Sequence, residues 1–169
     1  SDVDDIEMSG STVTISSDFT TGDILTLSSQ NGISGTFDSS IGVLTVTGTA
    51  SKENYQTALR SITYHSTSED PTITAGSRTV SWTVTDANSD GAGAATSSGV
   101  TSTINLTALS DDPVVTAGGT LSYTENSEPA AIDNTITISD VDDIEMSGST
   151  VTISSGFTTG DVLTLNSQN

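Results

Sequence analysis

The sequence predicts an all-β fold: an antiparallel β-sandwich with one short crossover helix, repeated with a period of 138 residues. Apolar side chains alternate with Thr and Ser along most of the chain, as in strands that bury one face. A first copy, Ser1–Asn31, returns as a second copy, Ser139–Asn169. The two copies differ at three positions only: Asp18 against Gly156, Ile24 against Val162 and Ser28 against Asn166. A period of this length suits a whole domain, so we expect a tandem array.

The alternation places each expected strand around a pair or triplet of apolar residues. These are Val13 and Ile15, Leu25 and Leu27, Leu44 and Val46, Val80 with Trp82 and Val84, Ile104 and Leu106, Leu121 and Tyr123, and Ile136 and Ile138. Between two such runs, Asn31-Gly32 predicts a tight hairpin turn. A complete unit would therefore hold about eight or nine short strands, which is typical of a β-sandwich.

One segment, Ser51–Arg60, has helical rather than strand periodicity, with Tyr55, Ala58 and Leu59 on one side. Ser51 is suited to cap the first turn, in which Glu53 lies, and Arg60 lies in the last turn. We therefore expect a short helix that crosses between the sheets.

A domain joint is expected at Leu109–Pro113, because Pro113 stops ladder pairing after a strand. Residues 1–110 then form a sandwich that lacks its first strands. Residues 111–169 form the N-terminal part of the next identical repeat.

Composition excludes several classes of function. There is no Cys, so neither disulfides nor thiol chemistry are expected. The 22 acidic residues against three Lys and Arg give a net charge of −19, which repels nucleic acid and anionic membranes and attracts divalent cations. No apolar run reaches the ~20 residues of a membrane span, so membrane insertion is not expected.

An acidic motif opens each copy. Asp2, Asp4 and Asp5 have the counterparts Asp140, Asp142 and Asp143, and the linker adds Asp111 and Asp112. Ca²⁺ prefers six to eight oxygen ligands, mostly carboxylates and carbonyls. We expect a calcium site that the motif shares with the linker; the alternative is a solvated acidic strand end.

A second candidate calcium loop starts at Asp86, with Asn88, Asp90 and Gly91 in the spacing of an Asp-x-Asn-x-Asp-Gly motif. The bidentate Glu that completes such a loop is replaced by Ser97. The same residues are typical of a Gly-rich hairpin turn, and the sequence favours neither interpretation.

Catalysis has little support, since the one His, His65, lies on an expected strand with no second motif directed at it. No enzyme activity is expected. A carbohydrate-binding module is a less favoured alternative, because it needs exposed aromatic residues and Trp82 alternates into the core.

A family resemblance follows from the order of several short motifs. They are Tyr123-Thr124-Glu125-Asn126, Ser139–Asp143, Gly22–Leu25, Gly42–Gly48, Asn54–Leu59 and Val84–Asp86. In this order they resemble the cadherin-like repeats of giant calcium-dependent RTX-type adhesins on bacterial surfaces. The resemblance implies a cadherin/immunoglobulin-like β-sandwich. The resemblance covers essentially the whole period.

The resemblance implies interdomain Ca²⁺ held by Glu125, Asp140, Asp142, Asp111 and Asp112. Ser110 departs from the pattern, since the family's linker often has Asn there. The function implied is a calcium-rigidified repeat that spaces an adhesive tip from the cell. Such a protein is secreted, extracellular or on the cell surface, and its partners are neighbouring repeats or identical chains. A filament subunit assembled by strand exchange is the alternative.

Overall fold

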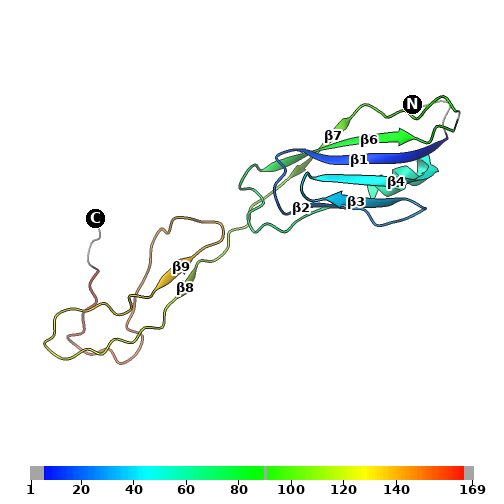
Figure 1. Ribbon diagram of the computed structural model, residues 1–169. Helices are drawn as coiled ribbons and strands as arrows, with labels where there is room; N and C mark the ends of the chain where they lie inside the picture. Colours follow the sequence, from blue (N-terminus) through cyan, green and yellow to red (C-terminus); the bar gives the residue numbers. More distant parts are fainter. Residues whose placement is uncertain (1–5, 90, 166–169) are drawn as a thin grey trace.

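The computed structural model describes residues 6–89 and 91–165 (Figure 1). In chain order the elements are β1 (Glu7–Ser17), β2 (Asp23–Thr26), β3 (Ser34–Asp38), β4 (Val43–Ser51), α1 (Lys52–Arg60), β5 (Thr63–Ser66), β6 (Ser77–Asp86), β7 (Val100–Asn105), β8 (Val114–Thr116) and β9 (Thr137–Ser139). The described chain is thus mostly antiparallel β-sheet with one short helix, as predicted. Elements β1 to β7 form one layered body, here called the sandwich, from which residues 106–165 extend at one end (Figure 1).

A five-stranded antiparallel sheet of order β3-β4-β1-β6-β7 forms the first layer of the sandwich. Its central strand is β1, in which Val13 lies opposite Leu44 of β4 and opposite Trp82 of β6. Strands β2 and β5 pair as a separate two-stranded sheet, with Leu25 opposite Tyr64. The small sheet and α1 contact the large sheet and cover part of one face.

The core lies between these layers and is built mostly from strand residues that the period-2 pattern places on inward faces, to which α1 adds Tyr55 and Ala58. Its most deeply buried apolar members are Val13, Ile33, Leu44, Val46, Tyr55, Ala58 and Val80. Burying one large aliphatic or aromatic side chain contributes about 1.5–3 kcal/mol. Strand β1 supplies Met8, Val13 and Ile15 to this core. The burial of these side chains depends on β4 and β6, which pair with β1 on its two sides.

The hairpin turn predicted at Asn31-Gly32 is confirmed. Both residues have positive φ angles, 52° and 78°, and Gln30 and Ile33 exchange two backbone hydrogen bonds of 2.9 and 2.8 Å. These are the features of a type I′ turn. Gly48 of β4 passes so close to this turn that a Cβ atom there would lie 2.1 Å from the carbonyl oxygen of Gly32.

The predicted helix is confirmed as α1. Ser51 Oγ accepts a hydrogen bond from the backbone N–H of Asn54 at 3.3 Å and so caps the first turn. The helix buries Tyr55 and Ala58. The Tyr55 hydroxyl donates a hydrogen bond of 2.5 Å to the carbonyl oxygen of Gly48, which fixes the helix against β4.

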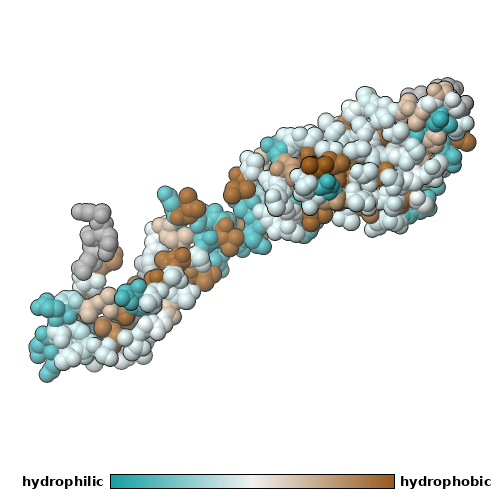
Figure 2. Space-filling view, in the orientation of Figure 1, coloured by the Kyte–Doolittle hydropathy of each residue, from teal (hydrophilic) through white to brown (hydrophobic). Residues whose placement is uncertain are grey.

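Residues 106–165 expose much more apolar surface than the sandwich does. Of the 20 large hydrophobic residues exposed in the described chain, 15 lie between Val114 and Leu165, and Figure 2 shows several of them at the surface. Within residues 6–89 and 91–165, strands β8 and β9 pair only with each other, with Val115 opposite Ile138. The strand predicted around Leu121 and Tyr123 is wrong: these residues are exposed in irregular backbone. No strand pairs with them in the described chain, and a strand without neighbours does not persist in water.

Candidate metal centre

Three carboxylates of the second copy gather immediately after β9. Asp140, Asp142 and Asp143 each offer one oxygen, and these oxygens all lie within 4.8 Å of one another. A turn brings them together, because Asp140 Oδ1 accepts hydrogen bonds from the backbone N–H groups of Asp142 and Asp143 at 3.1 and 3.0 Å. We call these three residues the Asp140 cluster.

Asp142 joins the Asp140 cluster to the linker. Its Oδ2 accepts a hydrogen bond from the backbone N–H of Asp111 at 3.1 Å, whereas its Oδ1 is buried and has no hydrogen-bond partner in the described chain. A side-chain hydrogen bond with Asp140, which needs a proton on one of the two carboxyls, raises the pKa of Asp142 against the opposing effect of the Asp111 N–H. Burial and the charges of Asp140 and Asp143 raise the same pKa.

The pKa of Asp140 is lowered instead, because hydrogen bonds from the backbone N–H of Asp143 and then from Asp142 stabilise its ionised form. The cluster therefore concentrates more negative charge than its own donors satisfy. Its donor set is oxygen only, which fits a hard cation such as Ca²⁺. Three carboxylates do not complete six to eight ligands, so backbone carbonyls or water must supply the others.

The remaining ligands predicted at the joint do not belong to the Asp140 cluster. Among the described residues, Asp111, Asp112 and Glu125 are outside the group of oxygens within 4.8 Å. Asp111 reaches the cluster through its backbone N–H instead. Glu125 is exposed in a turn that also contains Asn126, whose φ angle is 63°.

The first copy's acidic motif, Asp2, Asp4 and Asp5, lies outside the described residues, as does Asp90 of the second candidate loop. In that loop Asp86 is buried, and both its carboxylate oxygens accept backbone hydrogen bonds, from Asn88 at 3.1 Å and from Ala95 at 2.9 Å. Asn88 Oδ1 accepts a bond of 2.6 Å from Gly93 N–H. These contacts are those of a turn, and calcium binding by Asp86, Asn88 and Asp90 stays a prediction.

Two acidic residues with structural roles were not singled out in the sequence. The first is Asp133, whose Oδ2 accepts the N–H groups of Gly118 and Gly119 at 2.9 and 2.7 Å. Its Oδ1 accepts both donors of Thr135, and these bonds lower the pKa of Asp133 strongly. Asp133 thereby fixes the loop between β8 and β9.

The second is Asp23, which forms a buried ion pair with Arg78. Arg78 Nε lies 2.6 Å from Asp23 Oδ2, and both side chains are fully shielded from solvent. The other guanidinium nitrogens donate to Thr20 Oγ1 and to the carbonyl oxygens of Pro71, Ala75 and Ser77. The parity of each strand is the signal for this pair, because Arg78 precedes Val80 by two residues and Asp23 precedes Leu25 by two.

Burial raises the pKa of Asp23, but hydrogen bonds from Arg78, Tyr64 and Thr20 outweigh it, and the pKa lies below its usual value. Burial and the bond to Asp23 raise the pKa of Tyr64 to about 12. The ionised pair therefore ties β2, β5 and β6 together in the core.

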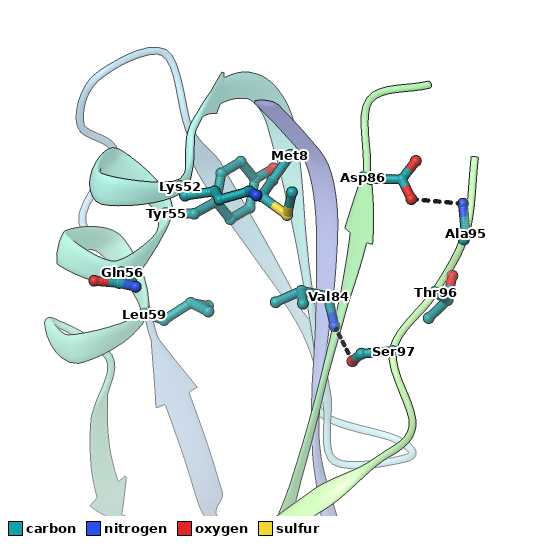
Figure 3. A pocket seen from close by; sticks show the side chains of 10 residues that line it. All are labelled: Met8, Lys52, Tyr55, Gln56, Leu59, Val84, Asp86, Ala95, Thr96 and Ser97. Atoms are coloured by element: carbon teal, nitrogen blue, oxygen red, sulfur yellow. Dashed lines mark hydrogen bonds between the residues drawn. The ribbon is translucent and has the colours of Figure 1, made fainter. Parts of the chain in front are cut away.

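An open groove of about 560 Å³ lies between α1 and the end of β6 (Figure 3). Met8, Tyr55, Leu59 and Val84 give it an apolar lining, with polar groups such as Gln56, Asp86 and Thr96 around them. Figure 3 shows the apolar side chains pointing into the space between the helix and the large sheet. The groove marks a part of the sheet face that neither α1 nor the two-stranded sheet covers.

His65 lies on an exposed position of β5 and does not line this groove. Among the described residues, no helix has the length and apolar character needed to cross a membrane. Comparison with protein families, with curated proteins and with solved structures finds no match to this chain.

Proposed function

We propose that the chain is a calcium-rigidified structural repeat of a large bacterial cell-surface adhesin, which spaces an adhesive tip from the cell. The resemblance of its motif order and its 138-residue repetition support this role. The observation that carries it is the buried Oδ1 of Asp142, which has no hydrogen-bond partner among the described residues. Asp142 belongs to a cluster of three carboxylates and accepts a hydrogen bond from the backbone of linker residue Asp111.

The mechanism is mechanical. The carboxylates of the Asp140 cluster would hold Ca²⁺, which would supply the positive charge that the cluster lacks. The turn at Asp140 keeps the carboxylates converged, and Asp142 holds the linker backbone against them through Asp111. With the charge of the cluster neutralised, the carboxylates would repel one another less, and the contact of Asp142 with Asp111 would leave the linker fewer orientations. Joints of this kind in series give a stiff rod outside the cell, with neighbouring repeats as the partners.

Calorimetric titration of the chain with CaCl₂ tests the proposal. We expect binding that Asp142→Asn weakens by at least about tenfold, because the variant lacks the charge and one ligand oxygen. Glu128→Gln removes one exposed negative charge outside the cluster and is the matched control, with affinity near that of the wild type. Equal loss in both variants, or no saturable binding in the wild type, would contradict a calcium site at Asp142.

A second candidate is the subunit of an extracellular filament built by strand exchange between chains. The exposed apolar side chains of the second copy favour it. A carbohydrate-binding module has less support, since Trp82 is only partly exposed and its Nε1 donates a hydrogen bond of 2.8 Å to Ser102.

A further inference from the structure

The two copies have nearly the same sequence and very different surroundings. In the first copy, Val13 is 0% exposed and Leu27 is 7% exposed; their counterparts Val151 and Leu165 are 68% and 93% exposed. The first copy supplies β1 and β2 to the sandwich, whereas from Asp140 to Leu165 the second copy contains no strand. In the described chain, residues 32–105 pack against the first copy, and the second copy has nearly the same sequence without a sheet beside it.

The second copy already has the turn that the sandwich requires. In the first copy Asp23 Oδ2 accepts bonds of 2.8 and 3.2 Å from the N–H and Oγ1 of Thr20, and Asp23 N–H donates to Thr20 O at 3.1 Å. In the second copy Asp161 makes the same three bonds with Thr158, at 2.9, 3.3 and 3.1 Å. Asp161 is thus preformed in the geometry that meets Arg78, but it lies exposed.

We propose that residues 144–165 of one molecule replace residues 6–27 in the sandwich of a second molecule of this chain. In the exchanged state the second copy pairs with β4 and β6 of its partner, as β1 now does. Asp161 then takes the position of Asp23 beside Arg78. The proposal rests on the packing of the sandwich and not on calcium at the Asp140 cluster.

The sequence differences between the copies should change the free energy of the sandwich little when one copy replaces the other. Asp18 and Gly156 both have left-handed φ angles, 61° and 73°, and glycine adopts that conformation without Cβ strain. Val162 has one methylene fewer than Ile24, which is only partly buried. These two changes act in opposite directions, and neither prevents the second copy from fitting.

Exchange also places an apolar residue of the second copy at the groove shown in Figure 3. Met8, at the start of β1, lines the groove, and Met146 takes its place on exchange.

Disulfide trapping between two singly substituted chains tests the exchange. Thr14 lies opposite Ser81 in the pairing of β1 with β6, and Thr152 is the counterpart of Thr14. Paired residues of neighbouring strands have Cα atoms close enough for a disulfide. The chain contains no other Cys. A tagged Thr152→Cys chain, mixed with an untagged Ser81→Cys chain and mildly oxidised in chelator, should give a cross-linked heterodimer.

The control replaces Thr152→Cys by Thr120→Cys, which is exposed and lies outside both copies. We expect at least fivefold less heterodimer from this mixture. Equal yields from the two mixtures, or no heterodimer from either, would overturn the proposal. The chelator keeps the result independent of whether Ca²⁺ binds at Asp142.

A reciprocal pair of variants gives a second test through light scattering after size exclusion. Asp23→Asn leaves Arg78 without its carboxylate unless Asp161 of another chain takes that place, so the dimer association constant should rise at least about tenfold. Asp161→Asn should lower it by a similar factor. General destabilisation would move both variants in the same direction, and such a result would refute the exchange.

Discussion

A comparison of the first copy with the second shows which structure local sequence determines and which structure requires packing against other segments. Between residues 6 and 27 the copies differ at Asp18 and Ile24 only. Both form the turn that ends at Asp23 or Asp161, with the same three hydrogen bonds. Only the first forms β1 and β2, because β4, β6 and β5 lie beside it.

This difference has a physical cause. A turn needs a few hydrogen bonds between neighbouring residues, whereas a strand needs backbone partners and an apolar surface that other segments supply. Alternation of apolar and polar residues therefore predicts which face a strand would bury. It does not predict whether a neighbouring sheet is present to cover that face. The two copies provide matched variants for testing this distinction.

Amide hydrogen exchange should show the largest difference between the copies. Amides of β1 in the core of the sandwich open only with global unfolding, so we expect protection of about 10³-fold or more. Amides of residues 150–154 should exchange nearly as fast as in an unfolded peptide. Peptides that contain Asp18 or Gly156 differ in mass, so mass spectrometry at low protein concentration distinguishes the copies. Equal protection would mean that the second copy is packed in solution.

The same truncation in each copy should affect stability unequally. Leu25→Ala removes a side chain that is 3% exposed in the core, and a loss of about 2–5 kcal/mol is expected from burial and the cavity left behind. Leu163→Ala changes a side chain that is 42% exposed, and less than about 0.5 kcal/mol is expected. Urea unfolding of the sandwich, followed through Trp82 fluorescence, measures both. A comparable loss from Leu163→Ala would contradict its exposure.

Much of the fold was predictable because its signals are local or periodic. The type I′ turn at Asn31-Gly32, the Ser51 cap and the inward faces of β1, β4 and β6 all follow from residue type and spacing. The absence of a strand around Leu121 and Tyr123 was not predictable from the alternation there, because the lack of a pairing partner does not show in the segment's own sequence.

The candidate site was predictable in part. The grouping of Asp140, Asp142 and Asp143 follows from a run of carboxylates in a turn, but the contact of Asp142 with the Asp111 backbone depends on how the linker folds. The Arg78–Asp23 pair was missed although strand parity directs both side chains inward. Charged side chains are rarely fully buried unless they are paired, so parity alone does not predict a buried ion pair.

Acid titration of stability should separate Asp23 from Asp161. The pKa of Asp23 is lowered in the folded state, so its contribution to stability is complete above its unfolded value of about 3.9 and is lost as pH falls through the lowered value. We expect the melting temperature of the wild type to decrease once the pH is lowered below about 4. Asp23→Asn should be less stable at pH 7 and should show a flatter curve below pH 4. Asp161→Asn should follow the wild type, and a flattened curve there would contradict its position outside the sandwich.

The smallest expected effect comes from Asp18→Gly, which gives the first copy the residue of the second. Asp18 has a φ angle of 61°, where a Cβ atom costs about 1 kcal/mol, somewhat less for Asp than for most residues. Glycine removes that strain but loses more backbone entropy on folding, by about 0.5–1 kcal/mol. The substitution also removes the exposed hydrogen bond of 2.6 Å from Ser17 Oγ to Asp18 Oδ2, which contributes little in water. These effects nearly cancel, so Asp18→Gly should change the melting temperature of the sandwich by no more than about 2–4 °C. Gly156→Asp should leave it unchanged, because this turn does not pack against the sandwich. A large drop for Asp18→Gly would show that the Ser17–Asp18 bond, rather than the backbone angle, determines how β1 ends.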